Sequence, residues 1–334
     1  MKAIRVAEYG NANNLSYDDT PQPEVGDGQA LVKIDIAGVN FIDVYMRSGL
    51  YAKSHTYAQK LPMTLGMEGA GILASLKPNG SNIEASGIKE GDRVAYCTEL
   101  GSYADYASVA TWKIIPVPDD IPLDIATTLM LQGSTAHYLS HSLFPLKPGQ
   151  RCLIHAASGG VGQLLVQLAK SCGAEVFASV GSLEKAKLAK ANGADHIILY
   201  KDEDFAAFIL DATDGDGVHV VYDSIGKATI NGSLKVTRRR GTCVNYGAAS
   251  GAVEAVSPLD LAEAGSVFFT RPHLADYIST HDERMMRAND LFGLYRNGKL
   301  KVTIDRTFPL AEAADAHRTI EAGLTKGKLL LTTT

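Results

Sequence analysis

We predict an α/β protein of two domains, one a doubly wound parallel sheet and the other mainly β. Three observations support this fold class. Residues 1–122 contain short, alternating strand-like segments that are broken by Gly, Pro and Asp. From residue 123 onward, apolar strand-like runs alternate with helical stretches, which favours a parallel sheet. A glycine-rich turn joins the first of these strands to the helix that follows it.

The first 122 residues are predicted to form an all-β lobe. The strand-like segments are AIRVAEY, ALVKIDIAGV, AGILASL, DRVAYC and YADYASV. Alternation of apolar and polar residues over such lengths is typical of half-buried strands, so we expect an irregular antiparallel barrel. The stretch at residues 75–90 is rich in turn-forming residues and is expected to be a surface loop.

Residues 123–268 are predicted to form the parallel sheet. The strand-like runs are RCLIHAA, EVFASV, HIILY, VHVVYDS, GTCVNYG and SVFFTR. Helical stretches such as VGQLLVQLAKSCG and SLEKAKLAKANG separate them, so helices should cover both faces of the sheet.

After Pro272 the sequence predicts a long helix, a strand, a second helix and a last strand. These elements are not joined to the sixth strand by a short crossover, so they are expected to rejoin the first lobe. The predicted domains are therefore residues 1–122 with 269–334, and residues 123–268.

The composition favours a small-molecule partner and a cytoplasmic location. The net charge is −5, from 32 basic and 37 acidic residues, so no strong positive field would attract nucleic acid or an anionic membrane. The four cysteines are scattered without metal or disulfide spacing, which fits reduced thiols in the cytosol. The sequence contains neither a signal peptide nor an apolar run of about 18 residues.

The glycine-rich turn predicts a dinucleotide site. In HAASGGVGQLLVQLAK, the three spaced fingerprint positions are held by Ala157, Gly159 and Gly162. Gly159 would let the backbone approach a diphosphate, and Gly162 would let the helix pack close to the strand. Ala157 replaces the first glycine, so the turn must avoid positive φ at that residue. The alternative is a glycine-rich loop without function.

The end of the second strand favours NADPH over NADH. An Asp or Glu at this point would bind the ribose 2′-hydroxyl and repel a 2′-phosphate. Here EVFASV continues into Gly181, Ser182, Leu183, Glu184 and Lys185. Ser179 or Ser182 can donate to a phosphate and Lys185 can supply positive charge, which favours NADPH. Against this, Glu184 is nearby, and Lys185 is alternatively an ordinary solvated helix residue.

Several longer segments identify a family. They are VNFIDVYMRSGLY (39–51), GMEGAGI (66–72), GDRV (91–94), GSYADYASV (101–109), LQGSTAHY (131–138), HAASGGVG (155–162), VYDSIG (221–226), RRGTCVNYG (239–247) and TRPHL (270–274). With them the chain resembles the zinc-free quinone oxidoreductases of the medium-chain dehydrogenase/reductase superfamily, the group that includes zeta-crystallin. The resemblance implies a Rossmann domain and a GroES-like catalytic domain.

The same resemblance indicates that no metal is bound. Metal-dependent relatives carry a Cys, a His and a four-cysteine lobe where this chain has Asn40, Met67 and only Cys97. Zinc requires several converging N, S or O ligands, which these residues do not supply. His137 and His141 have the i, i+4 spacing of a ligand pair, but without a third ligand nearby they are expected to be ordinary helix residues.

The resemblance also implies which residues would contact NADPH. Those of the first lobe are Phe41, Ile42, Asp43, Val44 and Tyr45. Thr135 and Tyr138 would lie near the nicotinamide, and Gly160 and Val161 at the diphosphate. Gly181, Ser182 and Lys185 would meet the 2′-phosphate, with Tyr200 at the adenosine. The remaining contacts would be Ser224, Tyr246, Gly247, Phe269 and Thr270, although Phe269 is equally explained as a core residue. Gly323 stands where some relatives carry an Arg. A charge contact with the cofactor at this place would therefore come from Lys326 or Lys328.

The expected reaction is hydride transfer from NADPH to a quinone or related conjugated carbonyl in a cleft between the lobes. The candidate catalytic residues are Asn40, Tyr45, Tyr51 and Thr135; the first three are candidate hydrogen-bond donors to the developing oxyanion. For each donor, ordering a loop or lining a pocket is an equal alternative.

Two other functions are open. One is NADPH-dependent reduction of alkenals or enones, and the other is a cofactor-occupied binding protein with RNA contacts at Arg238–Arg240. A homodimer is expected because SVFFTR would leave an unpaired apolar sheet edge.

Overall fold

The computed structural model describes residues 1–57, 59–77 and 87–333. Its contacts divide the chain into two compact units. Unit 1 comprises Met1–Ser134, Tyr277–Asn297 and Val302–Thr334, and unit 2 comprises Thr135–Asp276 and Gly298–Lys301. Residues 123–134, 269–276 and 298–301 are thus grouped differently from the domain limits expected from the sequence. Residues 78–86 of the loop expected at 75–90 lie outside the described part.

Unit 1 contains two sheets that are antiparallel apart from one parallel strand pair. The larger has the order β15-β16-β3-β5-β6-β8, with β7 paired to β3, and the smaller has the order β2-β1-β4. The strands are β1 (Lys2–Val6), β2 (Leu15–Asp19), β3 (Gln29–Val39), β4 (Met63–Thr64), β5 (Glu68–Lys77), β6 (Arg93–Cys97), β7 (Tyr106–Ala110), β8 (Ile115–Pro116), β15 (Ile304–Pro309) and β16 (Lys328–Thr332). The five strand segments predicted in residues 1–122 are all present.

The first 122 residues are not purely β, which corrects the prediction of an all-β lobe. The helix α1 (Phe41–Ser48) follows β3 directly. The Asn40 N–H donates to the Asp43 carboxylate at 2.8 Å, which caps the first turn, and Gly49 ends the helix with φ of 84°. These local start and stop signals outweigh the alternating pattern on either side.

The remaining helices of unit 1 support its sheets. They are α3 (Leu123–Thr128), α11 (His281–Arg296) and α12 (Ala313–Glu321), with 3₁₀ turns η1 (Ala12–Asn14), η2 (Thr111–Lys113) and η5 (Leu310–Glu312) and the π-helical segment η3 (Leu129–Gly133). The last strand pairs with β3, with Leu331 opposite Ala37. The C-terminal residues therefore complete the sheet that begins near the N-terminus.

Unit 2 is a six-stranded, wholly parallel sheet. Its strands are β9 (Arg151–His155), β10 (Glu175–Val180), β11 (His196–Leu199), β12 (Val218–Asp223), β13 (Thr237–Asn245) and β14 (Phe268–Thr270). Their spatial order is β11-β10-β9-β12-β13-β14. The chain leaves β9 toward one side and returns from β11 to the other, which is the doubly wound Rossmann arrangement. The predicted fold class is confirmed.

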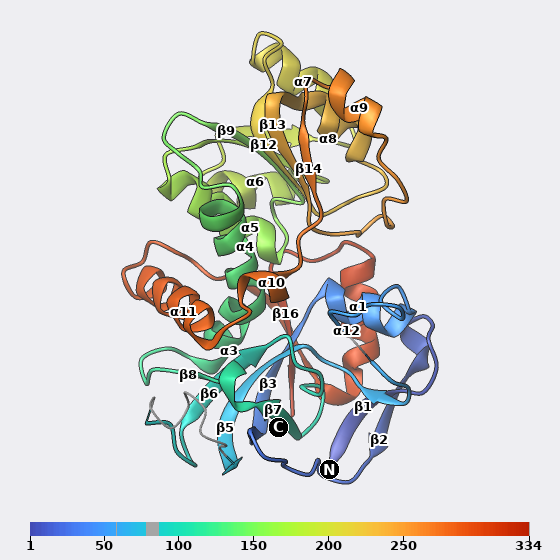
Figure 1. Ribbon diagram of the computed structural model, residues 1–334, viewed down its shortest axis with the longest axis vertical. Helices are drawn as coiled ribbons and strands as arrows, with labels where there is room; N and C mark the ends of the chain where they lie inside the picture. The colour runs from blue at the N-terminus through green and yellow to red at the C-terminus, as the bar shows by residue number, and fades with distance from the viewer. Residues whose placement is uncertain (58, 78–86, 334) are drawn as a thin grey trace. The chain divides into compact units, whose positions relative to one another are not determined.

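Helices cover both faces of this sheet. Those that contact its strands are α5 (Gly160–Ser171), α6 (Leu183–Ala191), α7 (Phe205–Ala212) and α8 (Ile230–Val236). The chain in this region also forms α4 (Ser134–Tyr138), the π-helical η4 (Leu139–Leu143), α9 (Pro258–Glu263) and α10 (Leu274–Tyr277). Within unit 2, Figure 1 shows α5 and α6 in green and α7 to α9 in yellow and orange around the strands.

The core of unit 2 explains this two-sided cover. Leu153, Phe177 and Val221 pack in one cluster with Ile209 of α7 and Leu234 of α8. The residues that alternate with them, such as Ile154 and Val220, are also fully buried. Because successive side chains of a strand point to opposite faces, both faces of the sheet are apolar and covered.

Candidate functional site

The carboxyl ends of the parallel strands gather most of the predicted cofactor residues of unit 2. Because all six strands run in one direction, their carboxyl ends share one edge of the sheet. The residues that follow or end these strands are Gly159, Gly160 and Val161 after β9, Gly181, Ser182 and Lys185 after β10, Tyr200 after β11, Ser224 after β12, Tyr246 and Gly247 after β13, and Thr270 at the end of β14. In open α/β sheets, this edge binds the ligand where the chain reverses its winding direction.

The turn between β9 and α5 has the geometry of a phosphate-binding turn. Gly159 is the N-cap of α5, and its N–H donates to the Ala156 carbonyl at 2.8 Å. The amides of the first helical turn have no partner inside the helix and carry its positive dipole end. They are therefore suited to bind an anion such as a diphosphate.

The small residues of this turn are required by its packing. A Cβ on Gly162 would lie 2.3 Å from the Ala156 carbonyl oxygen and 2.8 Å from Ala157 Cα. The expectation that Ala157 avoids positive φ is confirmed, because the left-handed residue is Ala156 instead, with φ of 50°. The turn thus places its strain one residue earlier than a glycine at the first fingerprint position would.

The loop after β10 brings together the residues predicted for a 2′-phosphate. A Cβ on Gly181 would lie 2.7 Å from the Tyr200 hydroxyl, so the tyrosine lies directly against this loop. Ser182 is exposed and caps α6, its Oγ accepting from the Lys185 N–H at 3.3 Å. β10 ends in Val180 without an acidic residue. These groups suit a phosphate ester.

Ser179 is not available to this loop, which corrects one of the two serine donors proposed from the sequence. Its side chain is 1% exposed, and its Oγ lies 2.7 Å from His155 Nδ1. The hydroxyl is therefore bound inside the protein.

The ends of β12 and β13 form a second close approach. The Tyr246 N–H donates to the Asp223 carbonyl at 2.8 Å, and a Cβ on Gly247 would lie 2.4 Å from the Ser224 carbonyl oxygen. Phe269 packs against the core cluster of unit 2, which supports the core interpretation of this residue. Thr135 and Tyr138 lie on α4 and are buried, so their contact with a cofactor remains a prediction.

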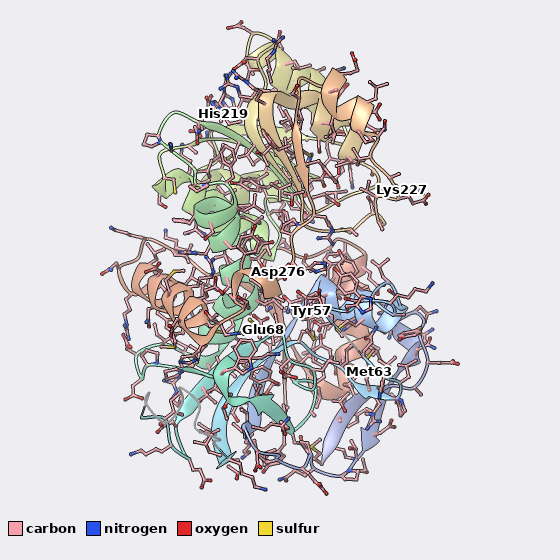
Figure 2. All side chains as sticks on the ribbon, viewed as in Figure 1. Tyr57, Met63, Glu68, His219, Lys227 and Asp276 are labelled. Carbon is pink, nitrogen blue, oxygen red and sulfur yellow. The ribbon has the colours of Figure 1, made fainter. Side chains whose placement is uncertain are left out.

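Unit 1 contains a buried ionic network that starts at Asn40. Lys328 Nζ forms an ion pair with Glu68, and both side chains are fully buried. Lys328 Nζ also donates to Asn40 Oδ1 at 2.9 Å, and Asn40 Nδ2 donates to Glu68 Oε2 at 2.9 Å and to the Gly38 carbonyl at 3.3 Å. Figure 2 labels Glu68 within unit 1. The network needs Gly38, because a Cβ there would lie 2.0 Å from Glu68 Oε2.

This network changes two expectations. Both N–H donors of Asn40 are used inside the protein, which supports the loop-ordering alternative over an oxyanion donor. Lys328 has no exposed surface and neutralises Glu68, which differs from the expected charge contact with the cofactor. Gln132 also joins the network, since its Nε2 donates to Asn40 Oδ1 at 3.2 Å.

Asp43 occupies a second buried position beside this network. Its carboxylate accepts from Met67 N at 3.0 Å and from the Tyr103 hydroxyl at 3.2 Å, in addition to Asn40 N. Burial raises the pKa of Asp43 to about 7. Tyr103 also contacts the His317 ring, whose pKa is lowered to about 3 by burial and by Arg47. Asp43 therefore acts as a helix cap inside the protein rather than as a group exposed to a ligand.

An aromatic row continues from α1. The rings of Phe41 and Tyr45 are 5.9 Å apart, those of Tyr45 and Tyr51 are 5.5 Å apart, and those of Tyr51 and Tyr57 are stacked at 5.6 Å. The structure thus brings the two predicted tyrosines together and adds Tyr57, labelled in Figure 2, which sequence reasoning missed. Tyr51 and Tyr57 lie in turns after the end of α1, where no helix or strand periodicity applies, so no local pattern indicates this row. Ile42 and Val44 lie on the same helix.

No cluster of three or more His, Cys, Asp or Glu side chains in the described residues is suited to a metal ion. Where metal-dependent relatives hold zinc, Asn40 and Met67 are joined by a Glu68 carboxylate that is already bound to an ammonium group. That donor set does not fit zinc. The rings of His137 and His141 stack on each other, with centroids 4.5 Å apart.

Two further surface features bear on partners. Arg238 contacts His219 Nε2 at 2.7 Å, whereas Arg239 and Arg240 are exposed. Among the described residues, no helix has the length and apolar character needed to cross a membrane.

Comparisons with known proteins agree with this architecture. The model of the alcohol dehydrogenase GroES-like domain matches residues 26–119, and the model of the zinc-binding dehydrogenase family matches residues 160–291. A quinone oxidoreductase of Pseudomonas aeruginosa is 41% identical, with 99% of each chain covered. A 2-haloacrylate reductase of a Burkholderia species is 37% identical over 99% of this chain and 98% of that protein.

The solved structure of Escherichia coli quinone oxidoreductase complexed with NADPH is also similar. Its TM-score is 0.94 at 35% identity, and the match covers 99% of this chain and 100% of that one. Similarity of this extent includes both units and the loops at the strand ends. The chain belongs to the quinone oxidoreductases of the medium-chain dehydrogenase/reductase superfamily.

Proposed function

We propose that this protein is an NADPH-dependent quinone oxidoreductase. The observation that carries the proposal is the shared sheet edge, where an open helix N-terminus after β9 adjoins a phosphate-type loop after β10. Relatives that match nearly the whole chain are named quinone oxidoreductases, and the one from E. coli was solved with NADPH.

The residues of this edge fit the cofactor. The amides of Gly160 and Val161 would bind the diphosphate, because they begin α5 and lack helical partners. Ser182 and Lys185 would bind the 2′-phosphate, with Tyr200 beside it. When bound, NADPH supplies a hydride to the acceptor. The contribution of the protein is to hold and orient the cofactor.

The proposed reaction proceeds without zinc. The position of the metal in relatives is filled by the pair of Glu68 and Lys328, which is a charge-neutral arrangement held by Asn40. Acceptor reduction places negative charge on oxygen, and a hydroxyl can donate to it. Besides Asn40, the candidates named from the sequence are Tyr45 and Tyr51. Phe41 and Tyr51, the partly exposed rings of the aromatic row, would lie against a quinone ring.

The cofactor assignment is tested with Lys185→Ala and a matched control, Lys187→Ala, from the exposed side of the same helix. Binding of NADPH and NADH is measured by calorimetry. We expect Lys185→Ala to weaken NADPH about tenfold and NADH little, since one charge-assisted hydrogen bond is lost. Equal losses for both cofactors would contradict recognition of the 2′-phosphate by Lys185.

The acceptor is tested by NADPH oxidation with a panel of quinones and α,β-unsaturated carbonyl compounds, including a 2-haloacrylate. Quinones are expected to give the highest kcat/KM. Turnover confined to the unsaturated compounds would replace quinone reduction by double-bond reduction. Tyr51→Phe is expected to lower quinone turnover, and an unchanged rate would remove Tyr51 as the donor.

We also propose a homodimer and a cytoplasmic location. β14 is the last strand of its sheet and Phe268 is 66% exposed, so the edge carries an apolar side chain beside unpaired backbone groups. A second copy of this strand would satisfy both. All four cysteines are free of disulfide bonds and three are buried, which suits a reducing compartment.

A further inference from the structure

His155 lies in the interior of unit 2, at the last position of β9 and directly before the phosphate turn. It is 1% exposed. Its Nδ1 is 2.7 Å from Ser179 Oγ on β10, and its Nε2 is 3.1 Å from Ser233 Oγ on α8. Its ring also meets the ring of Phe205 edge-on, with centroids 4.8 Å apart. Both ring nitrogens are therefore hydrogen-bonded inside the protein.

The chain of hydrogen bonds continues from Ser233 to Asp223. Ser233 Oγ donates to Asp223 Oδ2 at 2.7 Å. The other partners of the carboxylate are the N–H groups of Ile225 and Gly226, at 2.8 and 2.9 Å, and the Thr229 hydroxyl. Every one of these partners donates, so Asp223 acts as an acceptor throughout.

Because Asp223 only accepts, it sets the direction of each hydrogen bond from Ser233 through His155 to Ser179. Because the single hydrogen of Ser233 is given to Asp223, the Ser233 oxygen accepts from His155, and Nε2 must carry the imidazole proton. Nδ1 is then an acceptor, and the Ser179 hydroxyl donates to it. Burial lowers the pKa of His155, which agrees with a neutral ring.

The same groups stand directly before the loops assigned to the cofactor. His155 precedes Ala156, which has positive φ, and the Ser179 carbonyl accepts from Ala157 N at 3.2 Å. Ser179 thus binds the strand end through its hydroxyl and the turn through its carbonyl. At the other end of the chain, Asn245 Nδ2 joins the Asp223 carbonyl to the Gly247 carbonyl, at 3.3 and 3.0 Å.

We propose that His155 is a positioning residue for NADPH. Held as the Nε2–H tautomer by Asp223 through Ser233, it fixes Ser179 and thereby the turn at residues 156–162 that binds the diphosphate. The part that concerns the cofactor rests on the proposed function. The tautomer does not, because it follows from hydrogen bonds of the protein alone.

The first test is the tautomer itself, measured by long-range ¹H–¹⁵N correlation of the histidine rings at neutral pH without ligand. His155→Gln assigns the signal by its disappearance. We expect a neutral ring with the proton on Nε2. A proton on Nδ1, or a doubly protonated ring, would overturn the proposal.

Asp223→Asn should reverse the direction of the hydrogen bonds that link Ser233, His155 and Ser179. Its side-chain oxygen would stay with the amides of Ile225 and Gly226, and its NH₂ would donate to Ser233. Ser233 would then donate to Nε2, the proton would move to Nδ1, and Ser179 would become the acceptor. An unchanged tautomer in a folded variant would refute the directional role of Asp223.

The second test is affinity for NADPH, measured by calorimetry. His155→Leu is expected to weaken binding on the order of tenfold, because the strand end loses both hydrogen bonds. If that variant does not fold, Ser179→Ala removes one hydroxyl and is expected to weaken binding several-fold. The control is His219→Gln. His219 lies on β12, accepts a hydrogen bond from Arg151 N and is not hydrogen-bonded to His155, Ser179, Ser233 or Asp223 (Figure 2).

The outcomes separate the two proposals. Wild-type protein that does not bind NADPH would defeat the proposed function and leave the tautomer result standing. Full affinity in folded His155→Leu and Ser179→Ala proteins would defeat the positioning role while the function remained.

Discussion

The buried pair of Lys328 and Glu68 allows a quantitative prediction about stability. Replacing Lys328 with Met keeps an unbranched apolar side chain of similar length but removes the ammonium group. Glu68 would retain two donors, Asn40 Nδ2 at 2.9 Å and Leu131 N at 2.6 Å. Removing one partner of a buried ion pair costs about 3–5 kcal/mol of unfolding free energy. Because two donors remain, we expect Lys328→Met to lie near the lower end, about 3 kcal/mol.

The double variant Glu68→Gln, Lys328→Met tests the cause of this loss. Without either charge, no desolvated ion remains, and replacing an entire buried pair is often nearly neutral. We expect the double variant to recover more than half of the stability lost by the single one. Lys53→Met, at an exposed position of unit 1, is the control and should change stability by less than about 0.5 kcal/mol.

Urea unfolding followed by tryptophan fluorescence is the assay. The single tryptophan, Trp112, lies on η2 of unit 1 and reports on the unit that holds the pair. A loss below about 1 kcal/mol for Lys328→Met would contradict the argument from buried charge. The argument would also be contradicted if the double variant lost as much stability as the single variants Glu68→Gln and Lys328→Met lose together.

Three further predictions concern other parts of the chain. Gly162→Ala places a Cβ 2.3 Å from the Ala156 oxygen, so it should lower the free energy of unfolding in urea by about 1–3 kcal/mol and weaken NADPH binding. Its control is Gly293→Ala on α11, which has open space around it and should be neutral or stabilising. His317 has its pKa lowered to about 3, below the unfolded value, so its contribution to the free energy of unfolding should fall as pH drops below about 6.5, by about 1.4 kcal/mol per unit, whereas Asp43, with its pKa raised to about 7, contributes in the opposite direction. His317→Gln should lose about 2 kcal/mol less than wild type between pH 6.5 and 5, and identical pH profiles would show that the ring is not buried neutral. Phe268→Lys on the exposed edge of β14 should shift light scattering from dimer to monomer, and an unchanged mass would place any interface elsewhere.

The sequence predicted the parts of the structure that depend on local pattern. The six strands of unit 2 and the turn at Gly159 and Gly162 follow from apolar runs and glycine spacing, which act within a few residues. It missed α1, because Asn40, Asp43 and Gly49 are short-range cap signals inside a segment treated as β. The match of GMEGAGI to a family included Glu68 but did not show what its charge would meet.

The networks behind the site were beyond local reasoning for a physical reason. Lys328 and Glu68 are 260 residues apart in the chain, and His155 meets groups 24 and 78 residues away. Such partners are determined by strand order and register, not by spacing in the sequence. A charged residue at the start of an apolar run, as Glu68 is at the start of β5, was the available signal that a buried partner exists.

The buried carboxylates Asp223 and Glu68 are each satisfied within their own unit, and this has a consequence for cofactor preference. Asp223 is surrounded by donors and Glu68 is paired with Lys328, so neither carboxylate needs a ligand to be stable. The groups proposed to distinguish NADPH from NADH are instead Ser182, the exposed N-cap of α6, and Lys185, which is half-buried in the first turn of that helix. Replacing Ser182 with Asp should therefore shift preference toward NADH without a large loss of stability, because the substitution adds charge at an exposed helix N-cap, where Asp is well tolerated. A strong loss of stability in that variant would mean that the loop after β10 is energetically coupled to the buried hydrogen bonds of Ser179, His155 and Asp223.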